Sequence, residues 1–342
     1  MLIGGYTSRD NGKENDPMPL GHNRVLGEQS RPAEARPHRV VLANWPATIE
    51  DPRTETFESV LNHVASHGYE GIEFSLDAIG KYFPGDSKAV MARKVGRAVS
   101  EMGLEFVGST LHRTDAQARA RRWLGRFVDD AKLVQDAGGA FASVQFFLDE
   151  DYLNTGGAYR DDDEYLEWCA DCVTQMRDAA WGLGMNFYLE VHIDRITEDP
   201  AACCRILDLA TCELNGDMSH YLARGFLRGK HVERVLAHVG HTHVRLARKL
   251  GDLSAAAEDP AADWAEGGVT WQLFDFMKPA LDGGLSSRTI AGESGPLHLV
   301  TDPLTQDALL VPLWRAMARY ADAAAQGIAL PISSPDDLKP WG

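Results

Sequence analysis

Carboxylate and imidazole side chains stand at the ends of four successive apolar runs in the second half of the chain. They are Glu190, Asp217, His243 and Glu293. Several oxygen and nitrogen donors that converge on one point can hold a catalytic divalent cation and leave positions open for a substrate. Three carboxylates and one imidazole favour a hard ion over a thiolate-type zinc site. Mn²⁺ is the first candidate, with Mg²⁺ or Co²⁺ as alternatives.

Alternation along an extended chain determines which of these side chains share a face. Glu190 shares a face with His192, and His243 shares a face with Arg245, whereas Val191 falls on the opposite face. For any one of these residues, a structural ion pair or a buried histidine is the competing interpretation. The four donors taken together favour a metal site.

The elements that must position these donors follow a regular alternation of short apolar runs and helical patterns. The strands are predicted at 39–43, 71–74, 104–108, 141–146, 186–191, 213–217, 239–246 and 289–293. Helices are predicted between most of them, at 57–67, 87–102, 116–137, 162–181, from Asp199 onward, 231–236 and 303–325. Eight strand-then-helix units favour a (β/α)₈ TIM barrel over a doubly wound sheet.

The composition divides the chain into three parts. Residues 1–36 lack an apolar period and are predicted to be an N-terminal extension, 37–327 the catalytic barrel as a single domain, and 328–342 a C-terminal tail. The long segment 247–267 follows the seventh strand, so it is either a lid over the barrel mouth or a surface insertion. We expect a homo-oligomer, or a partner subunit bound through the extension.

Net charge and hydropathy restrict the partners. With 34 Lys and Arg against 50 Asp and Glu the net charge is −16, which disfavours nucleic acid and an anionic membrane. No apolar run reaches the roughly 20 residues of a bilayer span, and the N-terminus lacks the pattern of a signal peptide. We therefore expect a cytoplasmic protein with no membrane partner, whose five cysteines are mostly buried and reduced.

Five short motifs resemble those of the xylose-isomerase-like TIM-barrel superfamily, which includes sugar phosphate isomerases and epimerases and proteins of the AP-endonuclease family 2 type. They are Leu-Glu-Val-His at Glu190, Gly-Asp-Met-Ser-His at Asp217, His-Thr-His-Val-Arg at His243, Gly-Glu-Ser-Gly-Pro at Glu293 and Gly-Ile-Glu-Phe at 71–74. The resemblance implies that the four donors are metal ligands and that the two glutamates also move protons. It further implies that His220 and Arg245 contact the substrate.

One position departs from the pattern of the ketose epimerases. Those proteins usually continue from the fifth-strand Glu with a Pro, whereas this chain places His192 two residues after Glu190. His192 is therefore a candidate catalytic base, as in branches of the superfamily proposed to act on 3-keto glycosides; the alternative is that it orients Glu190. His112, Trp45 and Phe74 are further candidates for the substrate pocket, with strand-end or core positions as the competing interpretation.

These inferences lead to three functional hypotheses. The first is a metal-dependent isomerase or epimerase that acts on a keto sugar or sugar derivative through a metal-stabilised enediolate. The second is a lyase that eliminates the aglycone from a 3-keto O- or C-glycoside. The third is a sugar-binding barrel without catalytic activity. In all three the partner is a small carbohydrate.

Overall fold

Strands and helices alternate along most of the chain from Arg39 to Ala325, and every pair of neighbouring strands in the sheet is parallel. The computed structural model describes residues 37–43, 52–113, 123–149, 151–152, 155, 157–226, 228–245, 269–293, 303–330, 332 and 337. Within these ranges the side chains of 52, 112–113, 269–270 and 303–309 are not described. The segment 247–267 and Trp45, both singled out in the sequence, lie outside the described residues.

The strands form one sheet that is nearly closed into a barrel. They are β1 (Arg39–Ala43), β2 (Gly71–Glu73), β3 (Glu105–Arg113), β4 (Phe141–Phe146), β5 (Asn186–Glu190), β6 (Glu213–Asn215), β7 (Val239–His241), β8 (His243–Val244) and β9 (Thr289–Gly292). The hydrogen-bonded order is β7-β6-β5-β4-β3-β2-β1-β9-β8. Only Thr242 separates β7 from β8, so the chain itself joins the two ends of the sheet. The predicted (β/α)₈ TIM barrel is therefore confirmed, with β7 and β8 as halves of the seventh strand.

The break in the seventh strand has a local cause. The Thr242 hydroxyl donates a hydrogen bond to the Gly216 carbonyl (2.9 Å), and the His243 amide donates to Asn215 Oδ1 (3.0 Å). Side chains thus replace part of the backbone ladder between neighbouring strands. The predicted strand at 239–246 is interrupted at this point, but it still carries His241 and His243 into the barrel.

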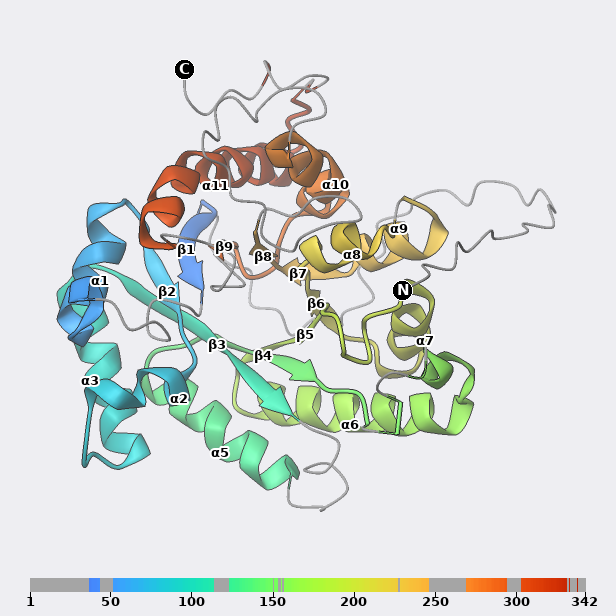
Figure 1. The fold of residues 1–342 in the computed structure, drawn as a ribbon, viewed down its shortest axis with the longest axis horizontal. Coiled ribbons are helices and arrows are strands. Elements are labelled where there is room, and N and C mark those ends of the chain that lie inside the picture. The colour runs from blue at the N-terminus through green and yellow to red at the C-terminus, as the bar shows by residue number, and fades with distance from the viewer. Residues whose placement is uncertain are drawn as a thin grey trace, which may run out of the picture. The chain divides into compact units, whose positions relative to one another are not determined.

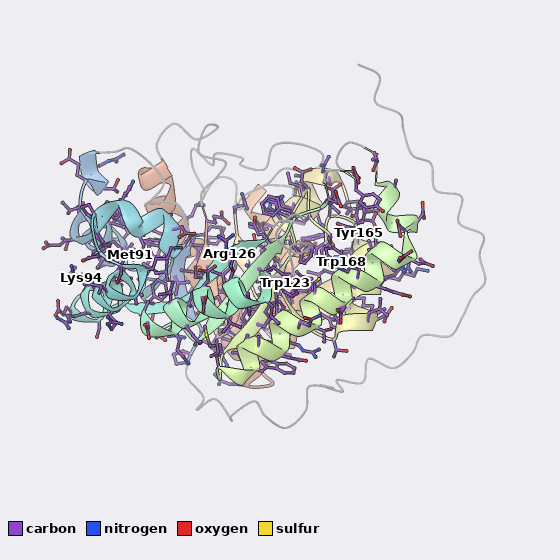
Figure 2. The ribbon with its side chains drawn as sticks, turned by 90° about the horizontal axis from the view of Figure 1, so that it is seen from below. Met91, Lys94, Trp123, Arg126, Tyr165 and Trp168 are labelled. Carbon is purple, nitrogen blue, oxygen red and sulfur yellow. The ribbon has the colours of Figure 1, made fainter. Side chains whose placement is uncertain are left out.

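Helices surround the strands, as Figure 1 shows. They are α1 (Phe57–Ser66), α2 (Leu76–Ile79), α3 (Lys88–Glu101), α5 (Trp123–Asp136), α6 (Asp163–Gly182), α7 (Pro200–Ala210), α8 (Ser219–Arg224), α9 (Lys230–Ala237), α10 (Val269–Gly283) and α11 (Pro303–Ala325). Figure 2 shows α3, α5 and α6 side by side, with buried Met91 and Trp123 and exposed Lys94 and Arg126. This division into an apolar and a polar face is typical of helices that cover a barrel.

The capping pattern predicted at the fifth helix is present. The Asp199 carboxylate accepts hydrogen bonds from the amides of Ala201 (2.9 Å) and Ala202 (3.1 Å), and Pro200 takes the first helical position. Because α7 begins at Pro200, the segment between β5 and this helix is short. It carries His192 and Arg195 directly beside the end of β5.

The core has two layers separated by the sheet. Val41, Val107, Phe141, Tyr188 and Ala291 belong to a small cluster, whereas their strand neighbours join the large cluster that includes the helices. In β5, for example, Leu189 belongs to the large cluster, as the alternation of strand side chains requires. Glu190 is two residues after Tyr188 in β5, so both side chains point to the same face of the strand. The small cluster therefore lies beneath Glu190.

By its internal contacts, Pro37–Gly342 forms a unit separate from the residues before it. The functional division into extension, catalytic barrel and tail stays a prediction. Among the described residues, no helix has both the length and the apolar character needed to cross a bilayer.

Candidate metal and catalytic site

The four donors predicted from the sequence lie at, or just after, the carboxyl ends of strands. His243 Nδ1 lies 3.8 Å from Glu190 Oε1 and 3.4 Å from Glu293 Oε2. Asp217 belongs to the same group through Arg245, which contacts both Asp217 and Glu293. Parallel strands deliver this arrangement because their carboxyl ends meet at one mouth of the barrel.

The Arg245 guanidinium lies between two of the carboxylates. Its Nε donates to Asp217 Oδ2 (3.0 Å), its Nη2 bonds the same oxygen, and Nη2 lies 3.3 Å from Glu293 Oε2. The other oxygen of Asp217 accepts the Ser219 hydroxyl. Burial alone would raise the pKa of Asp217, but Arg245 and His220 hold that pKa well below its usual value. Arg245 therefore acts as an internal cation for the acidic group.

Glu190 is the carboxylate with a free oxygen. Its Oε1 accepts a hydrogen bond from Gln145 Nε2 (2.7 Å), whereas its buried Oε2 has no hydrogen-bond partner among the described residues. Burial raises the pKa of Glu190 to about 7, with His243 opposing the shift and the carboxylates of Glu293 and Asp217 adding to it. A carboxyl group with such a pKa can take up and release a proton near neutral pH.

Three residues absent from the sequence prediction help to hold Glu190 in place: Gln145, Arg195 and Thr197. Gln145, in β4, accepts a hydrogen bond at Oε1 from Arg195 Nη2 (3.0 Å), and the Arg195 guanidinium carbon lies 3.4 Å from the centre of the Phe147 ring. The Thr197 hydroxyl donates to the Glu190 carbonyl (2.7 Å). A signal for Gln145 exists in the sequence, because a polar residue interrupts the apolar run at 141–146.

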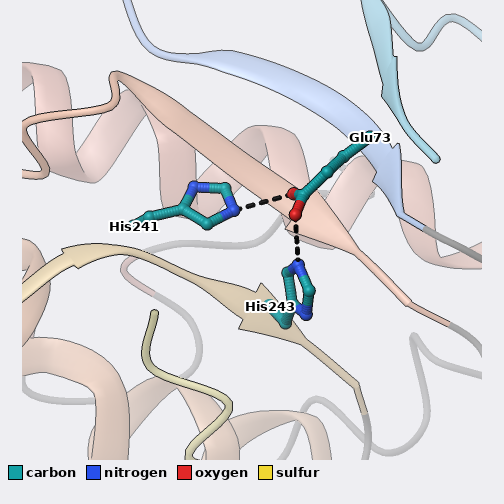
Figure 3. Close-up of side chains that lie close together, drawn as sticks. All are labelled: Glu73, His241 and His243. Atoms are coloured by element: carbon teal, nitrogen blue, oxygen red, sulfur yellow. Dashed lines mark hydrogen bonds and ion pairs between the residues drawn. The ribbon is translucent and has the colours of Figure 1, made fainter. Parts of the chain in front are cut away.

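A second buried group, shown in Figure 3, joins β2 to the seventh strand. Glu73 Oε2 lies 2.8 Å from His241 Nε2, and Glu73 Oε1 lies 2.9 Å from His243 Nε2. The side chains of all three are fully buried. Burial favours the neutral form of Glu73, but the two imidazoles outweigh it and hold the pKa of Glu73 far below its usual value. The sequence prediction missed Glu73 and His241, although both are polar residues inside short strands.

Glu73, His241 and His243 have a spacing that could hold a metal ion, so His243 is shared between two donor sets. The atoms of this inner set already bond one another. On the outer side, His243 Nδ1 and Glu190 Oε2 are buried and have no hydrogen-bond partner among the described residues. Buried polar atoms without a partner are unfavourable and rare. Among the described residues, the inner set is the donor group whose spacing fits an ion, so metal binding by Glu190, Asp217, His243 and Glu293 stays a prediction.

His192 and His220 stack at the edge of this group, with ring centroids 3.7 Å apart. His192 Nδ1 lies 2.7 Å from the Ile193 carbonyl, so Nδ1 donates a hydrogen bond and Nε2 keeps its lone pair. Burial lowers the pKa of His192 to about 2, and His220 and Arg245 add to the shift. His192 is therefore neutral, and Gln145 rather than His192 orients the Glu190 carboxylate.

Of the remaining candidates for the substrate pocket, only Phe74 has a described side chain, and it does not reach the donors. Phe74 is fully buried in the large core cluster that includes the helices. His112 lies in β3, but its side chain is outside the described part of the structure, as is the whole of Trp45. His220 and Arg245 do reach the site: His220 Nε2 lies 3.0 Å from Asp217 Oδ2 and 3.2 Å from Arg245 Nη2.

Comparison with known proteins identifies the fold. No protein-family model and no curated protein matches the sequence. Among solved structures, an E. coli 3-keto-D-glucoside 4-epimerase is 14% identical with a TM-score of 0.55, and the match covers 80% of this chain and 98% of the epimerase. An L-ribulose 3-epimerase is 13% identical with a TM-score of 0.56, and the match covers 86% of this chain and 99% of the epimerase. The IolI protein with a zinc atom is 14% identical with a TM-score of 0.55, and the match covers 85% of this chain and 97% of IolI. The chain therefore shares the TIM-barrel fold of these proteins, as its motifs predict.

Proposed function

We propose that this chain is a divalent-metal-dependent enzyme that isomerises or epimerises a keto sugar or sugar derivative. The observation that carries the proposal is the group of four donors from successive strand ends, in which Glu190 Oε2 and His243 Nδ1 are buried and form no hydrogen bond to any described residue. The names of two fold neighbours, a 3-keto-D-glucoside 4-epimerase and an L-ribulose 3-epimerase, support the choice of reaction class.

The metal would be held by Glu190, Asp217, His243 and Glu293. Oxygen donors with one imidazole suit Mn²⁺ best, with Mg²⁺ or Co²⁺ as alternatives. When bound, the ion would supply a positive charge that stabilises negative charge on substrate oxygens. The five cysteines are buried outside the donor group, which argues against a thiolate site. The zinc atom in the IolI structure supports a cation in this fold without identifying the ion here.

The two glutamates are suited to proton transfer at the substrate carbon. Glu190, with a pKa of about 7, removes the proton from the carbon beside the keto group and leaves an enediolate. Glu293 lies, like Glu190, on the Nδ1 side of His243 and would pass a proton taken up from solvent to that carbon or to its neighbour. His220 and Arg245 would hold substrate oxygens, since both lie beside Asp217 at the edge of the donor group.

The experiment is a metal analysis followed by a substrate screen. Protein purified without chelator is analysed for bound metal and then incubated in D₂O with ketoses and 3-keto glycosides. We expect an isomer or epimer that carries solvent deuterium, and loss of turnover in Glu190→Gln and Glu293→Gln. Full activity in either variant, or protein without bound metal, contradicts the proposal.

The lyase alternative depends on His192 as the base. Its Nε2 lone pair is available, but a pKa of about 2 makes His192 a weak base, so the structure favours Glu190 in that role. Release of a free aglycone from a 3-keto glycoside would identify elimination. Retained sugar binding with low metal occupancy would instead support the non-catalytic alternative.

We also keep the proposals of a cytoplasmic location and of a homo-oligomer, or of a partner subunit bound through residues 1–36. Light scattering of the full chain and of a variant that lacks residues 1–36 measures the state of assembly. A change in mass on truncation would assign the extension to an interface, and the same mass would exclude it.

A further inference from the structure

We propose that Glu73 is a positioning residue for the metal site: it fixes His243 so that Nδ1, and not Nε2, faces Glu190 and Glu293. The inference rests on the proposed function, because it concerns the same site. What carries it is the contact in which one fully buried carboxylate accepts hydrogen bonds from two histidines of the seventh strand (Figure 3).

An imidazole presents two different nitrogens, and a metal ligand must keep a lone pair on the nitrogen that faces the ion. An ionised carboxylate can only accept hydrogen bonds. Because His243 Nε2 lies 2.9 Å from Glu73 Oε1, Nε2 carries the proton in that bond. Nδ1 of the same ring is then the nitrogen available on the side of Glu190 and Glu293.

His241 makes this arrangement rigid. Its Nε2 donates to the second oxygen of Glu73, and its Nδ1 lies 2.9 Å from the Thr289 hydroxyl oxygen and 3.1 Å from that of Ser287. Hydroxyl groups can donate to Nδ1, so the whole ring of His241 is held by its neighbours. His241 thereby prevents Glu73 from turning away from His243.

The Glu73 carboxylate is further held from the barrel wall. Its Oε1 also accepts the Thr110 hydroxyl at 3.2 Å, so donors from β3, β7 and β8 converge on one side chain of β2. In such a buried group, removing one partner leaves another polar atom unsatisfied. The position of His243 therefore depends on a residue about 170 positions earlier in the chain.

The competing interpretation is that Glu73, His241 and His243 bind the metal themselves. Both Nε2 atoms would then have to lose their protons, and the contacts of 2.8 Å and 2.9 Å to Glu73 would be replaced. His243 Nδ1, which forms no hydrogen bond within the described residues and lies 3.4 Å from Glu293 Oε2, would then play no part in binding. The positioning role uses every observed contact and leaves Nδ1 for the ion.

Nuclear magnetic resonance of protein with ¹⁵N-labelled histidine tests the proposal, with Zn²⁺ as a diamagnetic probe. We expect His243 to carry its proton on Nε2 both without and with Zn²⁺, and the metal-induced shift to fall on Nδ1. In Glu73→Gln, the amide cannot accept from both imidazoles, so a tautomer change in His243 or His241 is expected. Its affinity for Zn²⁺ should fall by about 10–100-fold.

The matched control is Glu213→Gln. Glu213 is a carboxylate at the start of β6 that accepts the Ser286 hydroxyl (2.6 Å) at the opposite end of the strand from Asp217. We expect this variant to keep the wild-type histidine spectrum and Zn²⁺ affinity. A comparable loss of affinity in both variants would reduce the role of Glu73 to general stability and overturn the proposal.

Two further results would contradict it: Zn²⁺ on Nε2 of wild-type His243, or unchanged affinity in Glu73→Gln. If Glu73→Gln does not fold, the wild-type spectra still decide between Nδ1 and Nε2. The outcome is separate from the proposed reaction. A protein that binds Zn²⁺ through Nδ1 but turns over no sugar would preserve this inference and remove the function.

Discussion

The protons and charges of individual side chains set the behaviour of the site. Glu190 is a buried carboxyl whose Oε2 has no hydrogen-bond partner in the described part of the chain, and burial together with neighbouring carboxylates raises its pKa to about 7. Burial lowers the pKa of His243, but Glu73, Glu293 and Glu190 together raise it well above its usual value. A metal ion bound by Glu190 has to displace the proton of that carboxyl, and one bound by His243 has to displace the proton on Nδ1 while Nε2 keeps its proton toward Glu73.

This exchange predicts a pH-dependent affinity for Mn²⁺. Below the pKa of about 7 for Glu190, each unit of decrease in pH should weaken binding by at least about tenfold, because a proton must leave the carboxyl before the ion binds. Titration calorimetry at pH 6, 7 and 8 measures the slope, and Glu190→Gln should show weaker binding with a smaller slope. An affinity independent of pH would contradict the assignment of Glu190 as a ligand.

The position of Arg245 predicts a substitution that strengthens Mn²⁺ binding, whereas Glu190→Gln weakens it. Its guanidinium pairs with Asp217 and lies near Glu293, so it competes with an added cation for both. We expect Arg245→Gln to bind Mn²⁺ about tenfold more tightly, a gain of about 1.4 kcal/mol. The metal-free variant should lose about 3–5 kcal/mol of stability, because a buried carboxylate loses its partner.

Calorimetry and thermal unfolding with and without Mn²⁺ test this expectation, with Arg245→Lys as the charge-conserving control. The metal-induced increase in melting temperature should be larger in Arg245→Gln than in the wild type. Weaker Mn²⁺ binding in Arg245→Gln would show that the guanidinium assists the ion instead of competing with it.

His192 predicts a loss of stability in acid. Its pKa is lowered from 6.5 to about 2 in the folded protein, so below pH 6.5 the unfolded chain binds a proton that the folded chain does not. This difference destabilises the fold by about 1.4 kcal/mol per pH unit, or about 2 kcal/mol between pH 7 and pH 5. His192→Gln should lose correspondingly less stability over that range in urea unfolding. Equal losses in both proteins would exclude a buried neutral His192.

At the level of the elements, local patterns in the sequence predict much of the barrel. The bounds of β1, β4 and α11 coincide with the apolar runs and the helical pattern that predict them. The helices α8 and α10 were not predicted, and α10 lies just after the segment 247–267. Periodicity therefore identified the strands that carry Glu190 and His243, but not every helix around them.

Contacts between distant elements explain what the sequence could not predict. Glu73 meets His241 and His243 only because β2 and the seventh strand face each other across the barrel. No local spacing encodes that pairing. The Gln145 contact with Glu190 likewise depends on the register of β4 against β5, whereas the pattern within one strand could reveal only that each side chain faces inward.

A substitution at Gly216 tests whether the packing of β6 against β7 positions Asp217, the predicted metal ligand that follows it. A Cβ atom there would lie 2.7 Å and 2.9 Å from the methyl carbons of Val239, so Gly216→Ala must shift β6 or β7 beside Asp217. We expect weaker Mn²⁺ binding and a stability loss of about 1–3 kcal/mol. Gly125→Ala is the control, because Gly125 lies in α5 with nothing within 4 Å of the added atom. Unchanged Mn²⁺ binding in Gly216→Ala would contradict the positioning role of this close packing.

At the level of the whole molecule, closure of the sheet gathers the chemistry at one mouth. β7 pairs with β6 and β8 pairs with β9, so Asp217, His243 and Glu293 come from adjacent positions around the barrel. Glu190 joins them from β5, which pairs with β6. The same closure places Glu73 on the far side of His243, where it can hold the ring from behind.

Metal stoichiometry across four proteins tests the central claim most directly. The wild type, Glu190→Gln, Asp217→Asn and the control Glu213→Gln are purified without chelator, loaded with Mn²⁺, dialysed and analysed for bound metal. The donor group at the strand ends predicts one ion per chain in the wild type and in the control, and loss of that ion in the other two. A wild type that retains no Mn²⁺, or ligand variants that retain a full complement, would contradict it.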